Sequence, residues 1–512
     1  MMSITANSAF IQLILLLWRG LLTLWSQSAV GRWFARAGRA MRVCAEQSAV
    51  CRLAAREGAV MRSWPDSLIR RLAAALINIP CALFRWLYQI ARGLWDGSLA
   101  FRALSALGGA AWIPLGLLLL VMLCVPHESW NNIYGFLGVM LAAGLFLVGC
   151  MRHSRQRLQL ERLGPYMILY MGFICYGLAA SLSTSLSMRF FLFHLTCFLI
   201  VLLMVSSIKS YRQLHVLVAL VGAGLLAAAV YGCYQSYIGV EVVLSQVDES
   251  LNADMPGRIY SFFDNPNNFA EILVMLVPLM LALLINARTF GGKFLTLVVL
   301  GSSVAAIGFT YSRSGWIGLA GAVVLFFAFR NWRLVPVLLV AGIAAVPFLP
   351  ESIYNRVLTI GNMEDSSTLY RFSIWKATGN LLKDYGLRGV GLGNDVMKTA
   401  FEQYPPMMDG NYPIHTHNNY LQMWSEVGFF GLLAYLALVL GQLKAGVRAF
   451  VKGTDKRVKW MLSAAISAMC GILVISLAEY TWFYPRNMFL FWFLFGVIAV
   501  CVKITRTQED VK

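Results

Sequence analysis

The sequence is short of charged residues. Aspartate, glutamate, lysine and arginine make up only 13% of its 512 residues, whereas apolar residues make up 59%. A soluble globular domain is nearer one quarter charged and about half apolar. This composition excludes an ordinary soluble enzyme and indicates that most of the chain lies in a non-aqueous environment.

Cysteine is missing from the two longest polar segments, residues 236–266 and 350–418, although the chain has ten cysteines. A disulfide framework would need cysteines in such segments, so we interpret the ten as small packing residues. The metal-binding motif His-Glu-x-x-His is also missing, and the His-x-His formed by His415 and His417 has no implied third ligand. The sequence therefore predicts no metal site.

The chain does contain apolar runs of about 20 residues, the length that crosses a bilayer as a helix. The strands of a membrane barrel would be about 10 residues long and would alternate in polarity. We therefore predict an all-α, polytopic membrane bundle of about 12 transmembrane helices, with amphipathic helices in a large polar loop. The predicted spans are residues 103–125, 132–150, 165–184, 189–207, 213–235, 267–287, 293–311, 314–330, 333–349, 419–442, 459–480 and 486–503.

Basic residues gather in alternate loops between these spans. Four lie within 152–162, six within 444–459 and three after residue 502. The positive-inside rule then places both termini in the cytoplasm and the segments 236–266 and 350–418 in the periplasm. The net charge of +18 thus indicates topology and contact with anionic lipids, and we predict no nucleic-acid partner.

Three regions follow from these patterns. Residues 1–102 hold thirteen arginines, no lysine and four acids, and the stretches 8–25 and 68–95 look amphipathic, which predicts a cytoplasmic or interfacial extension. The apolar spans define a membrane domain at 103–505. Residues 506–512 form a predicted cytoplasmic tail.

The segment after residue 414 carries the strongest functional signal. His417 and Asn418 stand where a long polar segment enters an apolar run, and Gly428 and Gly431 follow inside that run. A histidine at a membrane boundary can exchange a proton near neutral pH, and we predict that His417 acts as a general base. Glycines inside a membrane helix allow close approach by another helix or a lipid chain.

Arginines on the predicted outer side break the positive-inside pattern. Arg313 lies in the tight turn TYSRSGW, and Arg258 precedes the turn Asn265-Pro266-Asn267. A guanidinium held at this interface is suited to phosphate, although snorkelling or a local salt bridge would also explain it. Arg486 is a third candidate for phosphate binding, with snorkelling as an equal alternative.

Other polar residues allow two interpretations. Glu426, inside a span, either takes part in the chemistry or pairs with an arginine to orient it. We interpret Arg371 as part of the solvated face of an amphipathic helix and Arg189 as an interfacial anchor. The glycines of RGVGLGND, residues 388–395, predict a turn, because no strand and helix flank them as a nucleotide site requires.

Taken as a set, these motifs resemble those of the O-antigen ligase and O-antigen polymerase superfamily of bacterial envelope enzymes. The similarity lies in His417-Asn418 followed by Gly428 and Gly431, in the Arg313 turn, and in Arg258 ahead of its turn, and it covers about residues 103–505. It implies an inverting glycosyltransferase of the inner membrane that uses no cofactor and faces the periplasm. Its donor would be a glycan on undecaprenyl diphosphate.

The resemblance also suggests roles for single residues. It implies that His417 is catalytic and that Arg313 and Arg258 bind the diphosphate. From the residues themselves we add Arg486 as a third candidate for the diphosphate, and Asn418, Glu426, Gly428 and Gly431 as supporting residues. We expect lipid A-core as the acceptor. The alternatives are a polymerase of repeat units or a ligase to protein, and a transporter of lipid-linked glycans is a third class. The absence of a visible repeat argues against transport.

Overall fold

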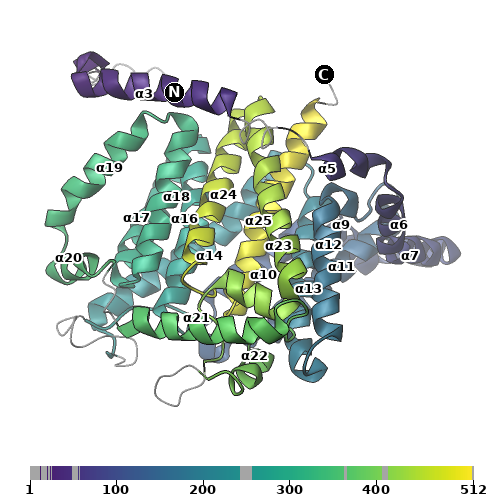
Figure 1. The fold of residues 1–512 in the computed structure, drawn as a ribbon. Coiled ribbons are helices and arrows are strands. Elements are labelled where there is room, and N and C mark those ends of the chain that lie inside the picture. Colours follow the sequence, from purple (N-terminus) through teal and green to yellow (C-terminus); the bar gives the residue numbers. More distant parts are fainter. Residues whose placement is uncertain are drawn as a thin grey trace. The chain divides into compact units, whose positions relative to one another are not determined.

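A computed structural model describes residues 12, 16, 20, 23–24, 26–48, 56, 58–242, 256–361, 366–405 and 413–509. Much of the predicted amphipathic stretch 8–25 lies outside these residues. All regular elements in the described ranges are helices, which confirms the predicted all-α class (Figure 1).

The chain divides into two compact units, Met1–Arg62 and Ser63–Lys512. The first contains α3 (Ala29–Gln47). The second begins well before the predicted boundary at residue 102, with α6 (Leu68–Ile77), α7 (Ile79–Ile90) and α8 (Arg92–Gly97). Helix α7 packs against α11 (Ile133–Arg152) and buries Cys81, so these amphipathic helices are attached to the bundle.

Nine helices in the described part of the chain are long and apolar enough to cross a membrane. They are α11, α13 (Thr184–Ser207), α14 (Tyr211–Ile238), α16 (Pro266–Asn286), α17 (Phe290–Phe309), α18 (Arg313–Arg330), α23 (Asn419–Lys452), α24 (Lys456–Ile475) and α25 (Pro485–Glu509). The protein is therefore an integral membrane protein.

The other three predicted spans take different forms. Helices α9 (Leu99–Gly109) and α10 (Trp112–Cys124) meet at a bend of 75° and would form a tenth span together. Helices α12 (Pro165–Ala179) and α19 (Leu334–Ala345) are shorter apolar helices. The structure is compatible with about twelve crossings but does not confirm that number.

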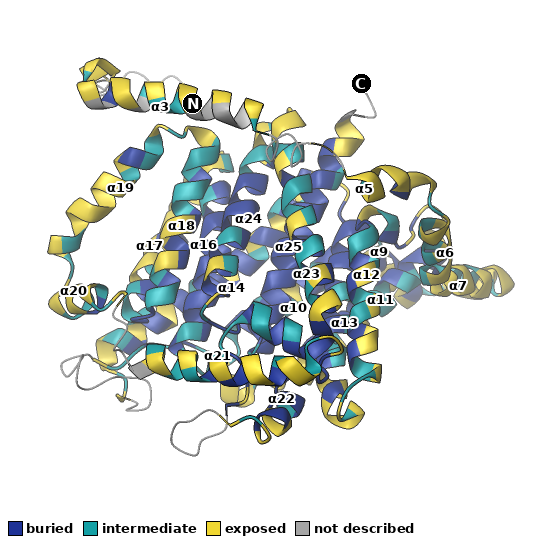
Figure 2. Cartoon of the chain, viewed as in Figure 1, coloured by how far each residue is buried: buried dark blue, intermediate teal, exposed yellow. Residues whose placement is uncertain are grey.

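The interior of the second unit is formed mainly by α13, α16, α24 and α25, and much of α16, α24 and α25 is coloured as buried in Figure 2. Small residues bring helices together there. A Cβ on Gly471 of α24 would lie 2.8 Å from the carbonyl oxygen of Gly318 in α18, so glycine permits the close contact of these two helices.

One end of the bundle carries the elements of the candidate site. Helix α21 (Ser366–Tyr385) runs across the helix ends there and packs against α23, and α22 (Asn394–Phe401) contacts both α21 and α13 (Figure 1). Helix α20 (Glu351–Leu358) precedes them. The predicted amphipathic helix in the segment 350–418 is therefore present as α21.

Candidate functional site

The turn that carries His417 is fixed from both sides. The indole Nε1 of Trp375 donates to the carbonyl of Thr416 at 3.0 Å, and the Thr416 amide donates to Gln422 Oε1 at 3.0 Å. Asn418 caps α23, because its Oδ1 accepts from the amides of Tyr420 and Leu421. His417 itself has a φ of 48°, a strained conformation for a non-glycine residue that often marks a functional site.

Glu479 joins His417 to Arg371. The Nδ1 atom of His417 lies 3.4 Å from Oε2 of Glu479, and a guanidinium nitrogen of Arg371 lies 2.5 Å from Oε1. Burial alone would raise the pKa of Glu479, but the Arg371 charge and the His417 contact outweigh it and lower this pKa to about 2. In the tautomer with hydrogen on Nδ1, the carboxylate orients the ring and leaves the Nε2 lone pair available.

His415 is placed as a packing partner of His417. Its Nδ1 accepts from the His417 amide at 3.2 Å, and the two ring centroids are 4.2 Å apart. Burial, followed by the nearby His417, lowers the pKa of His415 well below its ordinary value. The described residues contain no group of three or more His, Cys, Asp or Glu side chains arranged to hold a metal.

The backbone of the predicted turn at Arg313 accepts hydrogen bonds from neighbouring arginines. Tyr311 has a φ of 49°, and this conformation turns the chain between α17 and α18. The carbonyl of Thr310 accepts from Arg258 Nε at 2.8 Å, and that of Tyr311 accepts from Arg356 at 3.5 Å. Arg313 begins α18 and donates to the Thr359 carbonyl and to Ser367 Oγ, each at 3.1 Å.

Four guanidinium groups gather at this end of the bundle. We call Arg258, Arg313, Arg356 and Arg371 the arginine cluster. Burial and the charges of the other three arginines lower the pKa of Arg258 to about 9, with Glu479 acting in the opposite direction. Arg258 therefore stays charged at neutral pH although it is surrounded by like charges, and a bound anion would relieve that repulsion.

Arg486 lies apart from the arginine cluster. Its NH1 atom donates to the carbonyls of Met122 and Val125 at the end of α10, at 3.0 and 2.8 Å. Its guanidinium also stacks over Trp130 at 5.0 Å, and the side chain is fully buried. These contacts support a structural role in holding α10 and give no support to the predicted phosphate contact.

The two predicted glycines have different surroundings. Gly428 has a φ of 75° and breaks α23, and a Cβ there would lie 2.1 Å from the Leu387 carbonyl oxygen. Gly431 lies on the side facing α12, where its Cβ would be 3.6 Å from that of Phe173. Another helix, α12, therefore lies close to Gly431, as expected. At Gly428 the neighbour is a loop, whose backbone occupies the space that a side chain would need.

That loop is the glycine segment, residues 386–393. The amides of Val390 and Gly391 donate to the carbonyls of Ser425 and Glu426 at 2.7 and 3.1 Å, and the Phe429 amide donates to the Gly386 carbonyl at 2.8 Å. Positive φ angles at Gly389, Gly391 and Gly393 allow this course. The segment is a turn, as predicted, and it fixes the start of α23 behind His417.

Glu426 supports the turn from below. Its Oε1 accepts from Gln422 at 2.8 Å and from the Tyr480 hydroxyl at 3.3 Å, and Gln422 in turn holds Thr416. Of the two interpretations left open for Glu426, these contacts do not show the pairing with an arginine. The carboxylate that pairs with Arg371 is Glu479.

Three residues of the site escaped the sequence interpretation. Arg371 was interpreted as solvated, but it donates to the Ala478 carbonyl at 2.8 Å as well as binding Glu479. Glu479 allows from the sequence the same two interpretations as Glu426, and nothing there shows that its partners are Arg371 and His417. Arg356 is buried in α20, and the sequence analysis does not single it out. The sequence feature that could have pointed to these three residues is that each is a charged residue on the predicted outer side.

Part of the chain that forms this site matches the model of a known protein family. Residues 296–436 match the family model described as O-Antigen ligase. The matched region contains Arg313, Arg356, Arg371 and His417, whereas Arg258 and Glu479 lie outside it. The resemblance to the O-antigen ligase family predicted from the motifs is confirmed by this match.

A curated relative supports the same class. A Rickettsia conorii protein provisionally named a polysaccharide ligase is 27% identical over 137 residues, which are 25% of this chain and 33% of the relative. The match thus spans about a third of that relative's length. Together, the two comparisons support a ligase type of function for this membrane protein.

Proposed function

We propose that this O-antigen ligase family protein is an inverting membrane glycosyltransferase that moves a glycan from undecaprenyl diphosphate to a sugar hydroxyl of lipid A-core. The observation that carries the proposal is the contact of His417 with Glu479 and Arg371 at the bundle end that holds the arginine cluster. A base and an excess of positive charge are the two features that this reaction needs.

The arginine cluster would bind the diphosphate. A guanidinium presents several donors in one plane and suits phosphate oxygens better than an ammonium does. Charge builds on the diphosphate as its bond to the sugar breaks, and cations held in place before the reaction stabilise that charge. The donor is already activated, so neither a nucleotide nor another cofactor is required.

His417 would supply the base. Its Nε2 atom takes the proton of the acceptor hydroxyl while that oxygen forms a bond to the anomeric carbon. The bond between this carbon and the diphosphate oxygen breaks, and the electron pair leaves with undecaprenyl diphosphate. Attack from the opposite face inverts the anomeric centre. The carboxylate of Glu479 stabilises the imidazolium that results.

The reaction would take place at the periplasmic face of the bacterial inner membrane, where lipid-linked glycans and lipid A-core meet. The distribution of basic loops supports this orientation.

Substitution His417→Ala tests the role of the base. Purified variant and wild-type protein receive the lipid-linked donor and lipid A-core, and transfer falls by roughly 10²–10⁴-fold in the variant. Donor binding, measured separately, stays close to that of the wild type, because the arginine cluster is intact. His153→Ala, at an exposed histidine that follows the end of α11, is the matched control. Near-normal turnover of His417→Ala would refute the proposed base.

Deletion in the native host identifies the acceptor class. Loss of a ligase leaves long lipid-linked chains and unmodified lipid A-core. Accumulation of single lipid-linked repeat units would instead show that the protein is a polymerase.

A further inference from the structure

A cavity of about 510 Å³ lies beside the candidate site without including it. Its walls come from the loop before α11, the starts of α13 and α22, and the segments next to His415 and Pro485. None of the arginine cluster, His417 or Glu479 lines it. The volume falls within the range of roughly 300–1,000 Å³ that small-molecule sites occupy.

The cavity shares a wall with the histidine turn. Phe483 lines the cavity, and its ring centroid is 4.6 Å from that of His415, which in turn is 4.2 Å from that of His417. Ile414, the residue before His415, lines the cavity as well. A molecule held here would therefore lie on the far side of Phe483 and His415 from the proposed base, close to it but not in contact with it.

The lining is aromatic and carries amides. Trp130, Phe136, Phe190 and Tyr484 are among its rings, and Asn131 and Asn394 are among its amides. The electron-rich face of an aromatic ring attracts the weakly positive C–H face of a sugar ring. Amide groups both donate to and accept from hydroxyls, so this combination is suited to a saccharide.

Two lining residues each have a buried polar atom whose hydrogen-bonding capacity is unsatisfied. Within the described parts of the chain, Asn394 Oδ1 and the Tyr484 hydroxyl make no hydrogen bond, and the two residues are only 7% and 8% exposed. Burial raises the pKa of Tyr484, which keeps its hydroxyl protonated and able to donate. One donor and one acceptor match the hydroxyls of a sugar, and a ligand would remove the cost of burying them unpaired.

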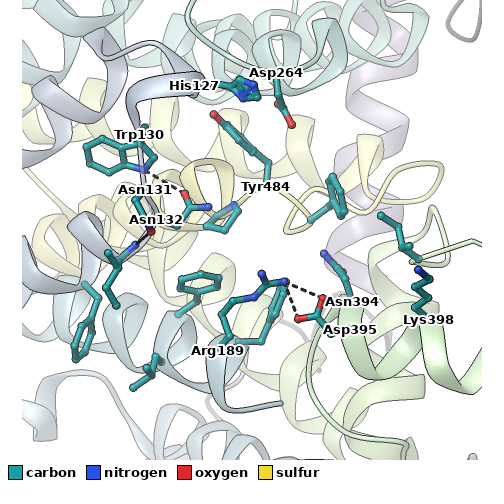
Figure 3. A pocket seen from close by; sticks show the side chains of 18 residues that line it. His127, Trp130, Asn131, Asn132, Arg189, Asp264, Asn394, Asp395, Lys398 and Tyr484 are labelled. Atoms are coloured by element: carbon teal, nitrogen blue, oxygen red, sulfur yellow. Dashed lines mark hydrogen bonds and ion pairs between the residues drawn. The ribbon is translucent and has the colours of Figure 1, made fainter. Parts of the chain in front are cut away.

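The charges around the cavity are balanced, unlike those of the arginine cluster. Arg189 pairs with Asp395 at 2.8 Å, and Lys398 and Asp264 are the other cation and acid of the lining. Figure 3 shows the Arg189–Asp395 pair on one side and His127, Asp264 and Tyr484 on the other. This environment suits a neutral ligand better than a diphosphate.

We propose that this cavity binds a neutral sugar unit of the acceptor saccharide. The donor sugar is bonded directly to the diphosphate and must lie at the arginines, which leaves the side bounded by Phe483 for the acceptor. This inference rests on the proposed function and adds a subsite for a sugar unit that neighbours the one whose hydroxyl attacks.

Two conservative variants test the cavity. Tyr484→Phe removes only the hydroxyl that lacks a partner, and Asn394→Ala removes the unpaired amide oxygen. Tyr404→Phe and Thr399→Ala are the matched controls, because Tyr404 bonds to Asp384 and Thr399 is exposed on α22. Transfer is measured with the undecaprenyl-diphosphate glycan and lipid A-core, each varied in turn. Each cavity variant raises the acceptor KM by roughly 3–10-fold, the loss expected for one hydrogen bond, and leaves the donor KM within about twofold.

Other results would overturn the inference. An unchanged acceptor KM in both cavity variants shows that the cavity does not bind the acceptor, and a selective rise in donor KM assigns it to the donor. If wild-type protein transfers no glycan, the proposed function fails first. Saturation-transfer NMR with the core oligosaccharide then decides about the cavity alone, because a sugar signal weakened by Tyr484→Phe supports it and the absence of a signal refutes it.

Discussion

Glu479 is the residue on which the candidate site depends most directly. It contacts a ring nitrogen of His417 and a guanidinium of Arg371, which come from two other segments of the chain. A buried carboxylate with such partners stays ionised, and its charge in turn offsets part of the repulsion among the arginines. One side chain thus orients the proposed base and stabilises the charge around it.

Substitution Glu479→Gln is expected to impair both functions. Glutamine keeps the shape but not the charge, so transfer falls by roughly 10²-fold or more. Because the folded protein lowers the pKa of Glu479 from 4.5 to about 2, its stabilising effect is complete above pH 4.5 and is lost as pH falls towards 2. Thermal unfolding in detergent at pH 7, 4.5 and 3 gives a stability difference from the variant that shrinks with falling pH. A constant difference, or one equal to that of the exposed control Glu402→Gln, would contradict this.

Arg313 depends on geometry as well as charge. It donates to Thr359 and Ser367 from two different nitrogens. Arg313→Lys keeps the charge and loses the planar fork, so we expect the donor KM to rise roughly tenfold or more. Arg333→Lys, in the connection that follows the opposite end of α18, is the control and leaves the donor KM unchanged. Equal donor KM values in both variants would favour simple snorkelling of Arg313.

At the scale of elements, the break in α23 and the glycine segment depend on each other. The segment 386–393 reaches the helix only because Gly428 lacks a side chain, and the helix can break there because amides and carbonyls of the segment replace part of its hydrogen bonding. The part of α23 between His417 and the break at Gly428 is thereby held beside α21.

Gly428→Ala tests this coupling. Alanine at a φ of 75° costs roughly 1–2 kcal/mol, and its Cβ would also collide with the Leu387 carbonyl. We expect a lower unfolding temperature and little transfer. Gly379→Ala in α21 is the control, because its Cβ meets nothing within 4 Å, and alanine there stabilises a helix slightly. If both variants unfold at the wild-type temperature, the segment does not depend on Gly428.

The sequence predicts the elements better than their contacts. The length of an apolar run identifies a span because the thickness of the bilayer sets that length. Basic residues identify alternate loops because lysine and arginine are enriched in loops on the cytoplasmic side. The bend between α9 and α10 and the shortness of α12 depend on packing, which a run of apolar residues does not specify. The contact of Arg371 also depends on packing. Amphipathic spacing predicts that Arg371 lies on the polar face of its helix, but it cannot predict that Glu479, 108 residues further along the chain, lies opposite.

At the scale of the whole molecule, the basic residues of the predicted cytoplasmic loops and the candidate site lie at opposite ends of the helices. The end of α23 and the start of α24 are rich in basic residues, and the end of α25 carries Lys503 and Arg506. His417 and the arginine cluster lie where α23 and α18 begin. In the proposed topology, anionic headgroups on the cytoplasmic side would attract the basic end, and the site would face the other side of the membrane.

This orientation predicts a labelling pattern. Single cysteines replace Glu402, Thr454 and Ser63, all exposed, in a protein whose Cys44, Cys51 and Cys175 are changed to serine. A membrane-impermeant maleimide labels position 402 in intact spheroplasts, and it labels positions 454 and 63 only after lysis. Transfer activity of each variant confirms that its fold is retained. The reverse pattern would place His417 on the cytoplasmic face, where it could not reach a periplasmic glycan, and both the topology and the proposed reaction would fall together.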